Sequence, residues 1–278
     1  MQTLPNFAGN VEFPRPFLPR PAMRHVLFDF DGTLSLIREG WPDVMVPMFA
    51  ELLPARPGET VEQLCRLALD DIMRLNGKQT IYQMIQLAER IRERGGQPED
   101  PLDYKKEYLR RLDARIRTRK EALREGAGDR DQFLVHGSRA LLEHLAARDL
   151  HLYLASGTDE VFVREEARLL GVDHYFGDQI HGARDDYKTF SKKMVIDRIL
   201  REYGVDGASL LAFGDGYVEI ENTRRVGGVA VAVASDEAHN GSGRIDAWKR
   251  ERLLGVGADV VIPDFRDAVP LVDYLLGP

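Results

Sequence analysis

The chain has 278 residues, of which 44% are hydrophobic and 30% are charged, and its formal net charge is −7. These values are typical of a soluble globular protein with a substantial core, and they exclude a disordered or membrane-spanning composition. The negative charge disfavours binding to nucleic acid or to an anionic membrane, so any attraction of a phosphorylated ligand must be local.

Residues 1–23 are rich in proline and lack the continuous apolar run of a signal peptide. They predict an extended arm on the protein surface. No apolar run approaches the ~20 residues that a membrane-spanning helix needs. Cys65 is the single cysteine, which excludes an intrachain disulfide and favours a reducing cytoplasm as the location.

Short apolar runs alternate with helical patterns along most of the chain. The predicted strands cover residues 25–30, 150–156, 209–215, 228–234 and 258–264. Apolar residues spaced three and four apart predict helices, the clearest of which cover residues 138–149, 159–171 and 191–204. This alternation predicts an α/β fold, in which a parallel sheet is covered by helices.

Residues 37–131 differ from the rest, because they have almost no β-branched runs and their helical patterns are broken by Pro and Gly. A segment this long between the first two strands far exceeds an ordinary crossover. It predicts an inserted all-helical subdomain, with residues 24–36 and 132–278 forming the α/β core. Arg and Lys are dense between residues 90 and 125, but acidic residues alternate with them, which predicts a solvated helix face.

Two carboxylates follow the first predicted strand in the segment VLFDFDGTLS. Asp29 and Asp31 fall on the same side of the chain, since side chains alternate along a strand, and Gly32 allows a sharp turn. Ligands of open parallel sheets bind outside the carboxyl ends of the strands, where these residues are expected. Their repulsion and burial would destabilise the fold unless a cation or a shared proton offset them.

A second acidic pair follows the third predicted strand, in the segment LLAFGDGYVEI. Asp215 ends this strand, and Glu219 lies about one helical turn further on. Strand ends of a parallel sheet can converge on one crevice, so up to four carboxylates can meet there. Oxygen donors in this number suit a hard divalent ion such as Mg²⁺.

Groups that can hold an anion follow two further predicted elements. Ser156 and Gly157 end the second strand just before a helix, where a hydroxyl and free backbone N–H groups can bind an anion. Lys188, Lys192 and Lys193 lie at the entrance to the helix before the Asp215 strand. A lysine there supplies positive charge to a nucleophile and a phosphate that would otherwise repel each other.

These segments resemble the motifs of a known family. In chain order, DFDGTLS, ASGT, SKK and FGDGYVE are similar to the four motifs of the haloacid dehalogenase (HAD) superfamily, and the helical insertion resembles the cap of that family. The resemblance extends from about residue 24 to the C-terminus. It implies a Rossmann-like parallel-sheet core, a helical cap that closes over the substrate, and phosphoryl transfer with Mg²⁺ as the cofactor.

The resemblance also implies a role for the residues that match each motif. Asp29 matches the nucleophile that attacks phosphorus and forms an aspartyl-phosphate. Asp31 matches the general acid that protonates the leaving oxygen and then activates water. Lys192 best matches the lysine that binds phosphate, because it opens a predicted helix at a typical distance before Asp215. Lys188 is the second choice.

Metal and phosphate ligands are implied in the same way. Asp29, Asp215 and the backbone carbonyl of Asp31 would bind Mg²⁺. Glu219 stands where the family often has Asp, which implies a water-mediated or outer role at the metal. The residues implied for the phosphate are Thr33, which would steady the loop, Ser156, Gly157 and Lys192.

The implied activity is that of a phosphatase that hydrolyses a small phosphate monoester, such as a sugar phosphate or a phosphoglycolate-like acid. Within the family, phosphatases and phosphomutases have a second acid at the position of Asp31, and dehalogenases and phosphonatases generally lack it. A sugar phosphomutase is therefore the nearest alternative. A phosphate-binding regulatory module without turnover is an alternative from another class. A nucleic-acid end-processing phosphatase is disfavoured by the net charge.

The implied partner is a small phosphorylated metabolite, and the sequence leaves the oligomeric state open. Specificity is expected to come from cap side chains that contact the rest of the substrate. Lys78 and Gln79 are candidates for this role. Trp41 and Trp248 are predicted to pack in the core or the helical subdomain.

Overall fold

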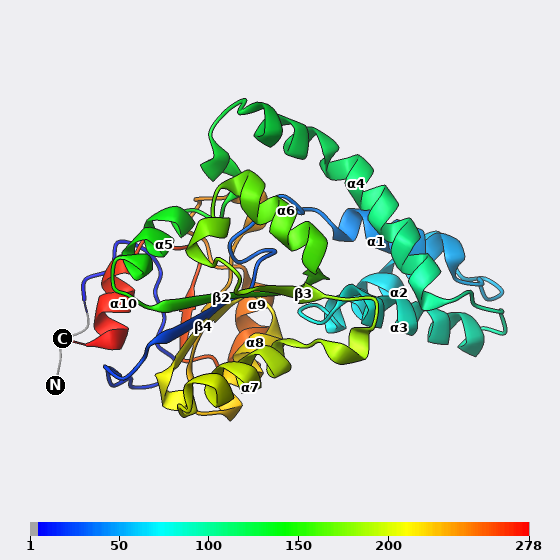
Figure 1. Ribbon diagram of the computed structural model, residues 1–278. Coiled ribbons are helices and arrows are strands. Elements are labelled where there is room, and N and C mark those ends of the chain that lie inside the picture. Colours follow the sequence, from blue (N-terminus) through cyan, green and yellow to red (C-terminus); the bar gives the residue numbers. More distant parts are fainter. Residues whose placement is uncertain (1–4, 278) are drawn as a thin grey trace.

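A parallel sheet lies at the centre of the α/β core in the computed structural model, which describes residues 5–277 (Figure 1). Its strands are β1 (His25–Phe28), β2 (His151–Asp159), β3 (Ile180–Ala183), β4 (Leu210–Gly214), β5 (Val229–Val233) and β6 (Val260–Ile262). Their spatial order is β3-β2-β1-β4-β5-β6, and each neighbouring pair is parallel. The chain therefore winds outward in both directions from β1, and ligands of such sheets bind where the winding direction changes.

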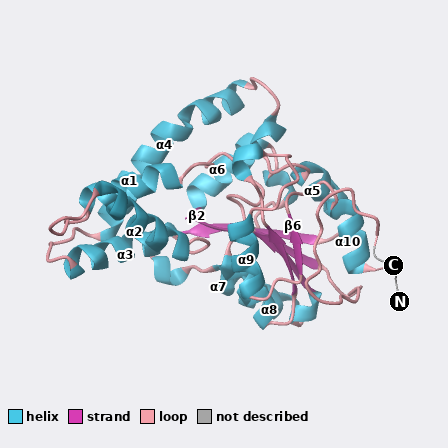
Figure 2. Cartoon of the chain, turned by 180° about the vertical axis from the view of Figure 1, so that it is seen from behind, coloured by secondary structure: helices cyan, strands magenta, loops and turns pink. Residues whose placement is uncertain are grey.

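Helices cover both faces of the sheet because alternate strand residues are apolar on both sides. One face packs against α5 (Ser138–Ala146), α6 (Glu160–Leu170) and α10 (Ala268–Leu276). The other face packs against α7 (Lys192–Tyr203), α8 (Tyr217–Arg225) and α9 (Ala247–Gly255). In β1, for example, Phe28 belongs to the first side and Leu27 to the second. Figure 2 shows these helices around the strands from behind.

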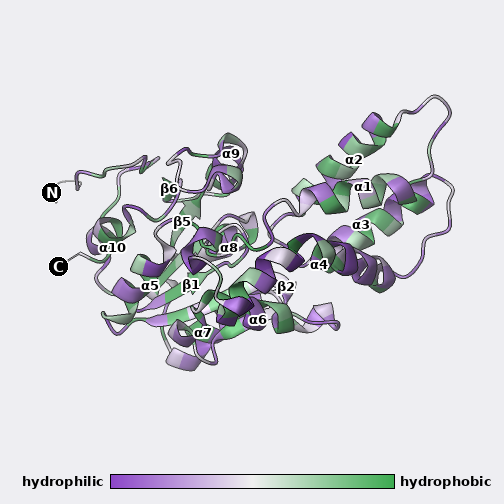
Figure 3. Ribbon diagram, turned by 90° about the horizontal axis from the view of Figure 1, so that it is seen from above, coloured by the Kyte–Doolittle hydropathy of each residue, from purple (hydrophilic) through white to green (hydrophobic). Residues whose placement is uncertain are grey.

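The first four helices after β1 form a lobe beside the sheet (Figure 3). They are α1 (Pro42–Leu52), α2 (Val61–Arg74), α3 (Thr80–Glu93) and α4 (Pro101–Glu125). Local signals fix their ends: Thr60 and Gln63 form a capping box at the start of α2, and Gly126 ends α4 in the left-handed conformation. Along α4, Tyr104, Tyr108, Leu112, Ile116 and Leu123 form the buried stripe.

Short 3₁₀ turns complete the connections. They are η1 (Arg130–Phe133), η2 (Asp173–Tyr175), η3 (Tyr187–Thr189), η4 (Gly207–Ser209) and η5 (Glu237–His239). Within residues 5–277, no helix combines the length and the apolar character that crossing a membrane requires.

The predicted fold class, a parallel-sheet core with an inserted all-helical cap, is confirmed. All five predicted strands are present, but β3 is an additional strand, and β2 continues to Asp159 instead of ending at residue 156. The division of the chain at residues 37 and 131 stays a prediction.

The proline-rich arm is described from residue 5 onward, and its first four residues lie outside the described part of the chain. It pairs with β6 through a single bridge between Glu12 and Val261. The rings of Phe13 and Phe17 lie 5.7 and 6.2 Å from the ring of Tyr274 in α10. Aromatic contacts, this bridge, the ion pair of Glu12 with Arg250 and the hydrogen bonds of the Ala8 and Gly9 N–H groups to Asp267 therefore tie the arm to the core.

Candidate active site

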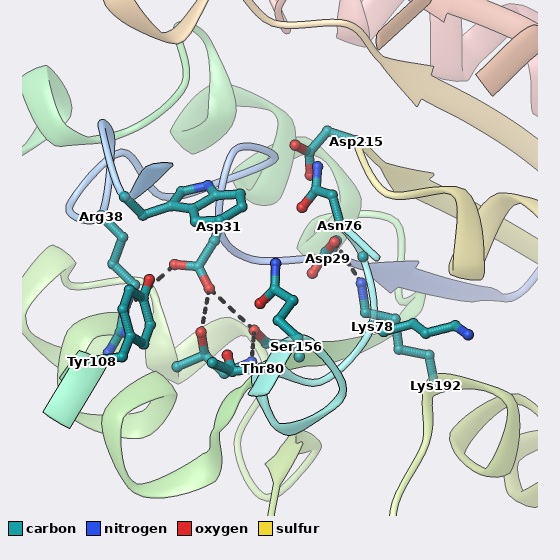
Figure 4. Close-up of a pocket in the computed structure, with 15 residues that line it drawn as sticks. Asp29, Asp31, Arg38, Asn76, Lys78, Thr80, Tyr108, Ser156, Lys192 and Asp215 are labelled. Carbon is teal, nitrogen blue, oxygen red and sulfur yellow. Dashed lines mark hydrogen bonds and ion pairs between the residues drawn. The ribbon is translucent and has the colours of Figure 1, made fainter. Parts of the chain in front are cut away.

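The candidate site lies at the carboxyl ends of β1, β2 and β4. Phe28, the last residue of β1, is beside Leu154 of β2 and Phe213 of β4. Asp29 and Asp215 therefore leave adjacent strands at nearly the same level, one residue after β1 and one after β4. Figure 4 shows them in one pocket with Asp31, Ser156 and Lys192.

A cluster of buried carboxylates occupies the inner end of this site. Oxygens of Asp29, Asp215 and Glu219 lie within 4.8 Å of one another. Lys192 joins two of these groups, because its Nζ is 2.5 Å from Asp29 Oδ2 and 2.8 Å from Glu219 Oε2. Glu219 also accepts a hydrogen bond of 2.7 Å from the backbone N–H of Gly216 at the start of α8.

The pKa values in the cluster follow from burial and from these contacts. Burial raises the pKa of the Asp29 carboxyl, Lys192 opposes this rise, and the charges of Glu219 and Asp215 add to it. Burial likewise raises the pKa of Glu219 against the effect of Lys192. Burial disfavours the charged form of Lys192, but its two carboxylate partners outweigh this and raise its pKa. Burial and mutual repulsion thus disfavour the simultaneous ionisation of these carboxyl groups, and the positive charge of Lys192 opposes this effect.

The donor set fits a divalent cation. Three buried carboxylates in mutual reach are hard oxygen ligands, and their repulsion in a low-dielectric site is relieved by added positive charge. The side chain of Asp31 lies outside this group of three. Asp29 and Asp215 line the cavity and are the candidate side-chain ligands of a metal, beside the backbone carbonyl of Asp31. Both oxygens of Glu219 are engaged, one by Lys192 and one by the Gly216 N–H, which is in line with an outer role at the metal.

A second buried lysine contacts the cluster from α9. Lys249 Nζ lies 3.0 Å from Asp215 Oδ2 and 2.7 Å from Glu237 Oε1. It also donates a 3.0 Å hydrogen bond to Ser235 Oγ, which in turn donates to the carbonyl of Gly32. These contacts fix the loop after β5 against the turn that follows Asp31.

Asp31 has a different environment from Asp29. Its Oδ2 accepts hydrogen bonds from Thr158 Oγ1 (2.8 Å) and Ser156 Oγ (3.2 Å). Its Oδ1 is buried without a hydrogen-bond partner among residues 5–277 and lies 3.7 Å from Arg38 Nε. Burial raises the pKa of Asp31, and Arg38 opposes the rise. A carboxyl group with a raised pKa can hold a proton for transfer to a reacting oxygen.

Arg38 is held in place by a buried ion pair. Its guanidinium donates from Nε and Nη2 to both oxygens of Glu166 in α6, at 2.7 to 3.2 Å. The side chain of Glu166 is fully buried. A two-pronged contact of this kind fixes the plane of the guanidinium, so Arg38 stays directed toward Asp31.

The three candidate lysines are separated by the fold. Lys192 is buried at the start of α7, where Ser191 caps the helix by accepting from the N–H of Met194. Lys188 and Lys193 are exposed, and Lys193 pairs with Asp197 one turn further along the same helix. Of the three, Lys192 is the lysine that reaches Asp29.

A cavity of about 80 Å³ lies between the cap and the strand ends. The core residues that line it are Asp29, Asp31, Arg38, Ser156, Gly157, Thr158, Lys192 and Asp215, and the residues before and within the cap helices are Trp41, Asn76, Gly77, Lys78, Thr80, Gln83 and Tyr108. Two predicted site residues lie behind this lining: Thr33 is bonded to Asp215, and Glu219 to Lys192. The cavity suits a small polar ligand.

Several residues of this site could not be recognised as site residues from the sequence. Arg38, Tyr108 and Lys249 stand in ordinary amphipathic or loop segments, and only the fold brings them to the carboxylates. Thr158 is the exception, because it belongs to the ASGT segment and follows Ser156 at the same strand end. Gln79, a predicted specificity residue, lies beside the cavity and bonds to the core.

Thr33→Val is expected to lower the free energy of unfolding by about 1–3 kcal/mol, because it leaves buried groups of Asp215 unsatisfied. Thr33 Oγ1 accepts from the Asp215 N–H (2.9 Å) and donates to Asp215 Oδ1 (3.1 Å). Urea unfolding measures the change. Thr223→Val is the matched control, because this buried hydroxyl has no hydrogen-bond partner within residues 5–277, so its loss is expected to be neutral. Equal losses in both variants would contradict the assignment.

The comparisons with known proteins agree with this architecture. The family model of the haloacid dehalogenase-like hydrolases matches residues 23–227. The chain therefore belongs to the haloacid dehalogenase-like hydrolase family, as its motifs predict. No match was found among the curated proteins.

Solved structures share the fold at low sequence identity. A conserved haloacid dehalogenase-like protein of unknown function from Agrobacterium tumefaciens has a TM-score of 0.60 and 15% identity, over 92% of this chain and 100% of that one. A HAD hydrolase of family IA, variant 3, from Entamoeba histolytica has a TM-score of 0.60 and 19% identity with the same coverage. A predicted phosphoglycolate phosphatase from Haemophilus somnus has a TM-score of 0.56 and 17% identity, over 90% and 98% of the two chains.

Proposed function

We propose that this hydrolase is a Mg²⁺-dependent phosphatase that acts on a small phosphate monoester through an aspartyl-phosphate at Asp29. The observation that carries the proposal is the pair of unlike carboxyl groups at one cavity. Asp29 lies in the carboxylate cluster beside Lys192, whereas Asp31 is buried beside hydroxyl groups and Arg38. Two carboxyl groups held in different environments can divide the roles of nucleophile and proton donor.

The chemical steps follow from these positions. A carboxylate oxygen of Asp29 attacks phosphorus, the bond from phosphorus to the ester oxygen breaks, and Asp31 gives its proton to that oxygen. Asp31 then takes a proton from a water molecule that attacks the aspartyl-phosphate, which releases inorganic phosphate and restores Asp29. Mg²⁺ would be held by the side chains of Asp29 and Asp215 and the backbone carbonyl of Asp31, with Glu219 in an outer position, and when bound it would supply positive charge that stabilises the negative phosphoryl group.

Other residues of this site bind the phosphate and orient the acid. The ammonium group of Lys192 lies beside Asp29, where it reduces the repulsion between the nucleophile and an incoming phosphate. Ser156 and the backbone of Gly157 line the same cavity and can donate to phosphate oxygens. Thr158, which donates to Asp31, keeps the acid directed at the cavity.

The substrate is inferred to be small and polar. On the cap side, polar side chains line the cavity of about 80 Å³. They are the amides of Asn76 and Gln83, the hydroxyl of Thr80, the phenol of Tyr108, the indole of Trp41 and the ammonium of Lys78. Such groups recognise hydroxyl or carboxylate substituents of a short leaving group. The Haemophilus somnus protein of similar fold is described as a predicted phosphoglycolate phosphatase, which is in line with this class.

A phosphate-release screen tests the proposal. Purified protein with Mg²⁺ is incubated with sugar phosphates, phosphorylated short acids and nucleotides, and parallel samples contain a chelator. Metal-dependent release from a short ester supports the proposal. An isomeric sugar phosphate as the product indicates a phosphomutase instead, and binding without release indicates a regulatory module.

Asp31→Asn is expected to reduce turnover of an alkyl phosphate by about 10²–10⁴-fold, because the general acid and base is lost. With 4-nitrophenyl phosphate the leaving group needs no proton, so formation of the aspartyl-phosphate is largely spared while its hydrolysis is slowed. Rapid mixing should then show a burst of nitrophenolate equal to the enzyme concentration. A variant that hydrolyses alkyl phosphates at the normal rate would refute this role of Asp31.

A further inference from the structure

The loop between α2 and α3, residues 75–79, lies directly on the core and closes one side of the cavity. Asn76, Gly77 and Lys78 line that cavity. The loop belongs to the cap, yet it is distant in sequence from both chain crossings that join the cap to the core. Contacts made by its own residues must therefore hold it in this position.

Arg252 of α9 makes the first of these contacts. Its Nη2 donates to the carbonyl oxygens of Arg74 (2.7 Å) and Asn76 (3.4 Å) at the carboxyl end of α2. Carbonyls in the last turn of a helix have no N–H partner within the helix and carry partial negative charge. A guanidinium placed there satisfies them and complements the helix dipole.

Two aromatic rings hold this guanidinium. Its carbon lies 4.7 Å from the ring centre of Tyr217 and 5.1 Å from that of Trp248. A planar guanidinium stacks well on aromatic faces, and it loses little freedom when its plane is already fixed. Trp248, which the sequence predicts as a packing residue, is 40% exposed and serves this contact instead.

Gln79 makes a contact at the other end of the loop. Its side-chain amide donates to the carbonyl oxygens of Tyr187 (3.0 Å) and Phe190 (2.7 Å). These carbonyls belong to the segment that leads directly into α7 and Lys192. The buried amide of Gln79 therefore joins the cap loop to the segment that positions the lysine beside Asp29.

Between these ends, the loop backbone meets core glycines. A Cβ on Gly157 would lie 2.5 Å from the carbonyl oxygen of Lys78, and a Cβ on Gly216 would lie 2.8 Å from Gly77 Cα. Contacts between Cβ atoms and backbone at these distances do not occur, so glycine is required for so close an approach. Gly157 directly follows Ser156 near the end of β2, and Gly216 directly follows Asp215 at the start of α8.

From these contacts we infer that Arg252 is a positioning residue that anchors the α2–α3 loop on the core and so holds Asn76, Gly77 and Lys78 in the lining of the cavity. The helix that carries Arg252 is itself held on the core, because Lys249, one turn earlier in α9, forms ion pairs with Asp215 and Glu237. Release of Arg252 would free the loop from the core at its α2 end. The effect of this anchor on catalysis rests on the proposed function, whereas the anchoring itself does not.

Hydrogen exchange of the amides of residues 75–79, measured by mass spectrometry, tests the anchoring without any substrate. In Arg252→Ala, exchange in this loop is expected to be at least several-fold faster than in the unchanged protein. Arg250→Ala is the matched control, because Arg250 lies on the same helix but pairs with Glu12 of the arm. Equal exchange in the Arg252 and Arg250 variants would overturn the inference.

Kinetics provide the second readout. Loss of a charge-assisted hydrogen bond that favours the docked loop is expected to raise KM for a phosphate ester about tenfold in Arg252→Ala, with a smaller change in kcat. Arg252→Lys keeps a donor and is expected to recover part of the loss. An equal fall in kcat in Arg252→Ala and Arg252→Lys, with KM unchanged, would contradict a positioning role.

Gln79→Ala keeps the inference testable should Arg252→Ala fail to fold, because it releases the loop from the opposite end. It is expected to speed exchange in the same residues and to raise KM in the same direction. Unchanged exchange and unchanged KM in this variant would overturn the anchoring role. If the unchanged protein releases no phosphate from any ester, the proposed function fails, while the exchange experiment still decides on the anchor.

Discussion

Asp29→Asn is expected to abolish phosphate release, with a loss of at least about 10⁴-fold, because a carboxamide cannot attack phosphorus to form the acyl phosphate. The fold should persist. Asparagine keeps the shape of the side chain, and its carbonyl can still accept the 2.7 Å hydrogen bond from the N–H of Phe30. Lys192 keeps Glu219 as a partner at 2.8 Å, so its charge is not left unpaired.

Two measurements check this expectation. Phosphate release is followed at saturating Mg²⁺, and the thermal midpoint reports whether the variant is folded. Asp178→Asn is the matched control, because it makes the same chemical change at an exposed position. Mass spectrometry of the unchanged protein, quenched in acid during turnover, should find phosphate on the peptide that contains Asp29. Retained activity in Asp29→Asn, or phosphate on another peptide, would refute the mechanism.

The core strands could be predicted from the sequence because their apolar runs are continuous and their ends are marked by polar residues. In β1 and β4 every residue is buried, and each strand is followed by an aspartate. β3 could not be predicted in this way. Its four residues, Ile180–Ala183, include a histidine and a glycine and form no apolar run. It exists as a strand because it pairs with the exposed edge of β2.

Some residues of the candidate site could be predicted from the sequence, and others could not. Carboxylates at strand ends are predictable, because topology brings strand ends together whatever the rest of the chain does. The contact of Arg38 with Glu166 joins residues 128 positions apart, and it depends on how α6 packs beside the segment that enters the cap. Lys249 is likewise one charged residue in the helical segment AWKRERLLG. Its burial becomes evident only when α9 is docked beside Asp215.

Lys192→Met is expected to lower the free energy of unfolding by about 3–5 kcal/mol near pH 8, because it leaves buried carboxylates without their shared cation. Lys192 is 3% exposed and lies within 2.8 Å of both Asp29 and Glu219. Methionine has nearly the same length and fills the space, so lost packing contributes little. Lys193→Met is the control. Lys193 is exposed on the same helix, so its replacement should change stability by no more than about 0.5 kcal/mol.

The pH dependence of the Lys192→Met defect distinguishes a charge effect from a packing effect. Burial already raises the pKa of Asp29 and Glu219, and removal of Lys192 takes away the opposing influence. A carboxyl whose pKa is raised by folding contributes its stability below its unfolded pKa and loses it as pH rises through the folded value. The defect should therefore be smaller in urea unfolding at pH 5 than at pH 8. Mg²⁺ should reduce the defect at pH 8, because a cation bound by the native cluster favours the folded state. A defect that is the same at both pH values and insensitive to Mg²⁺ would mean that Lys192 acts through packing and not by neutralising the cluster.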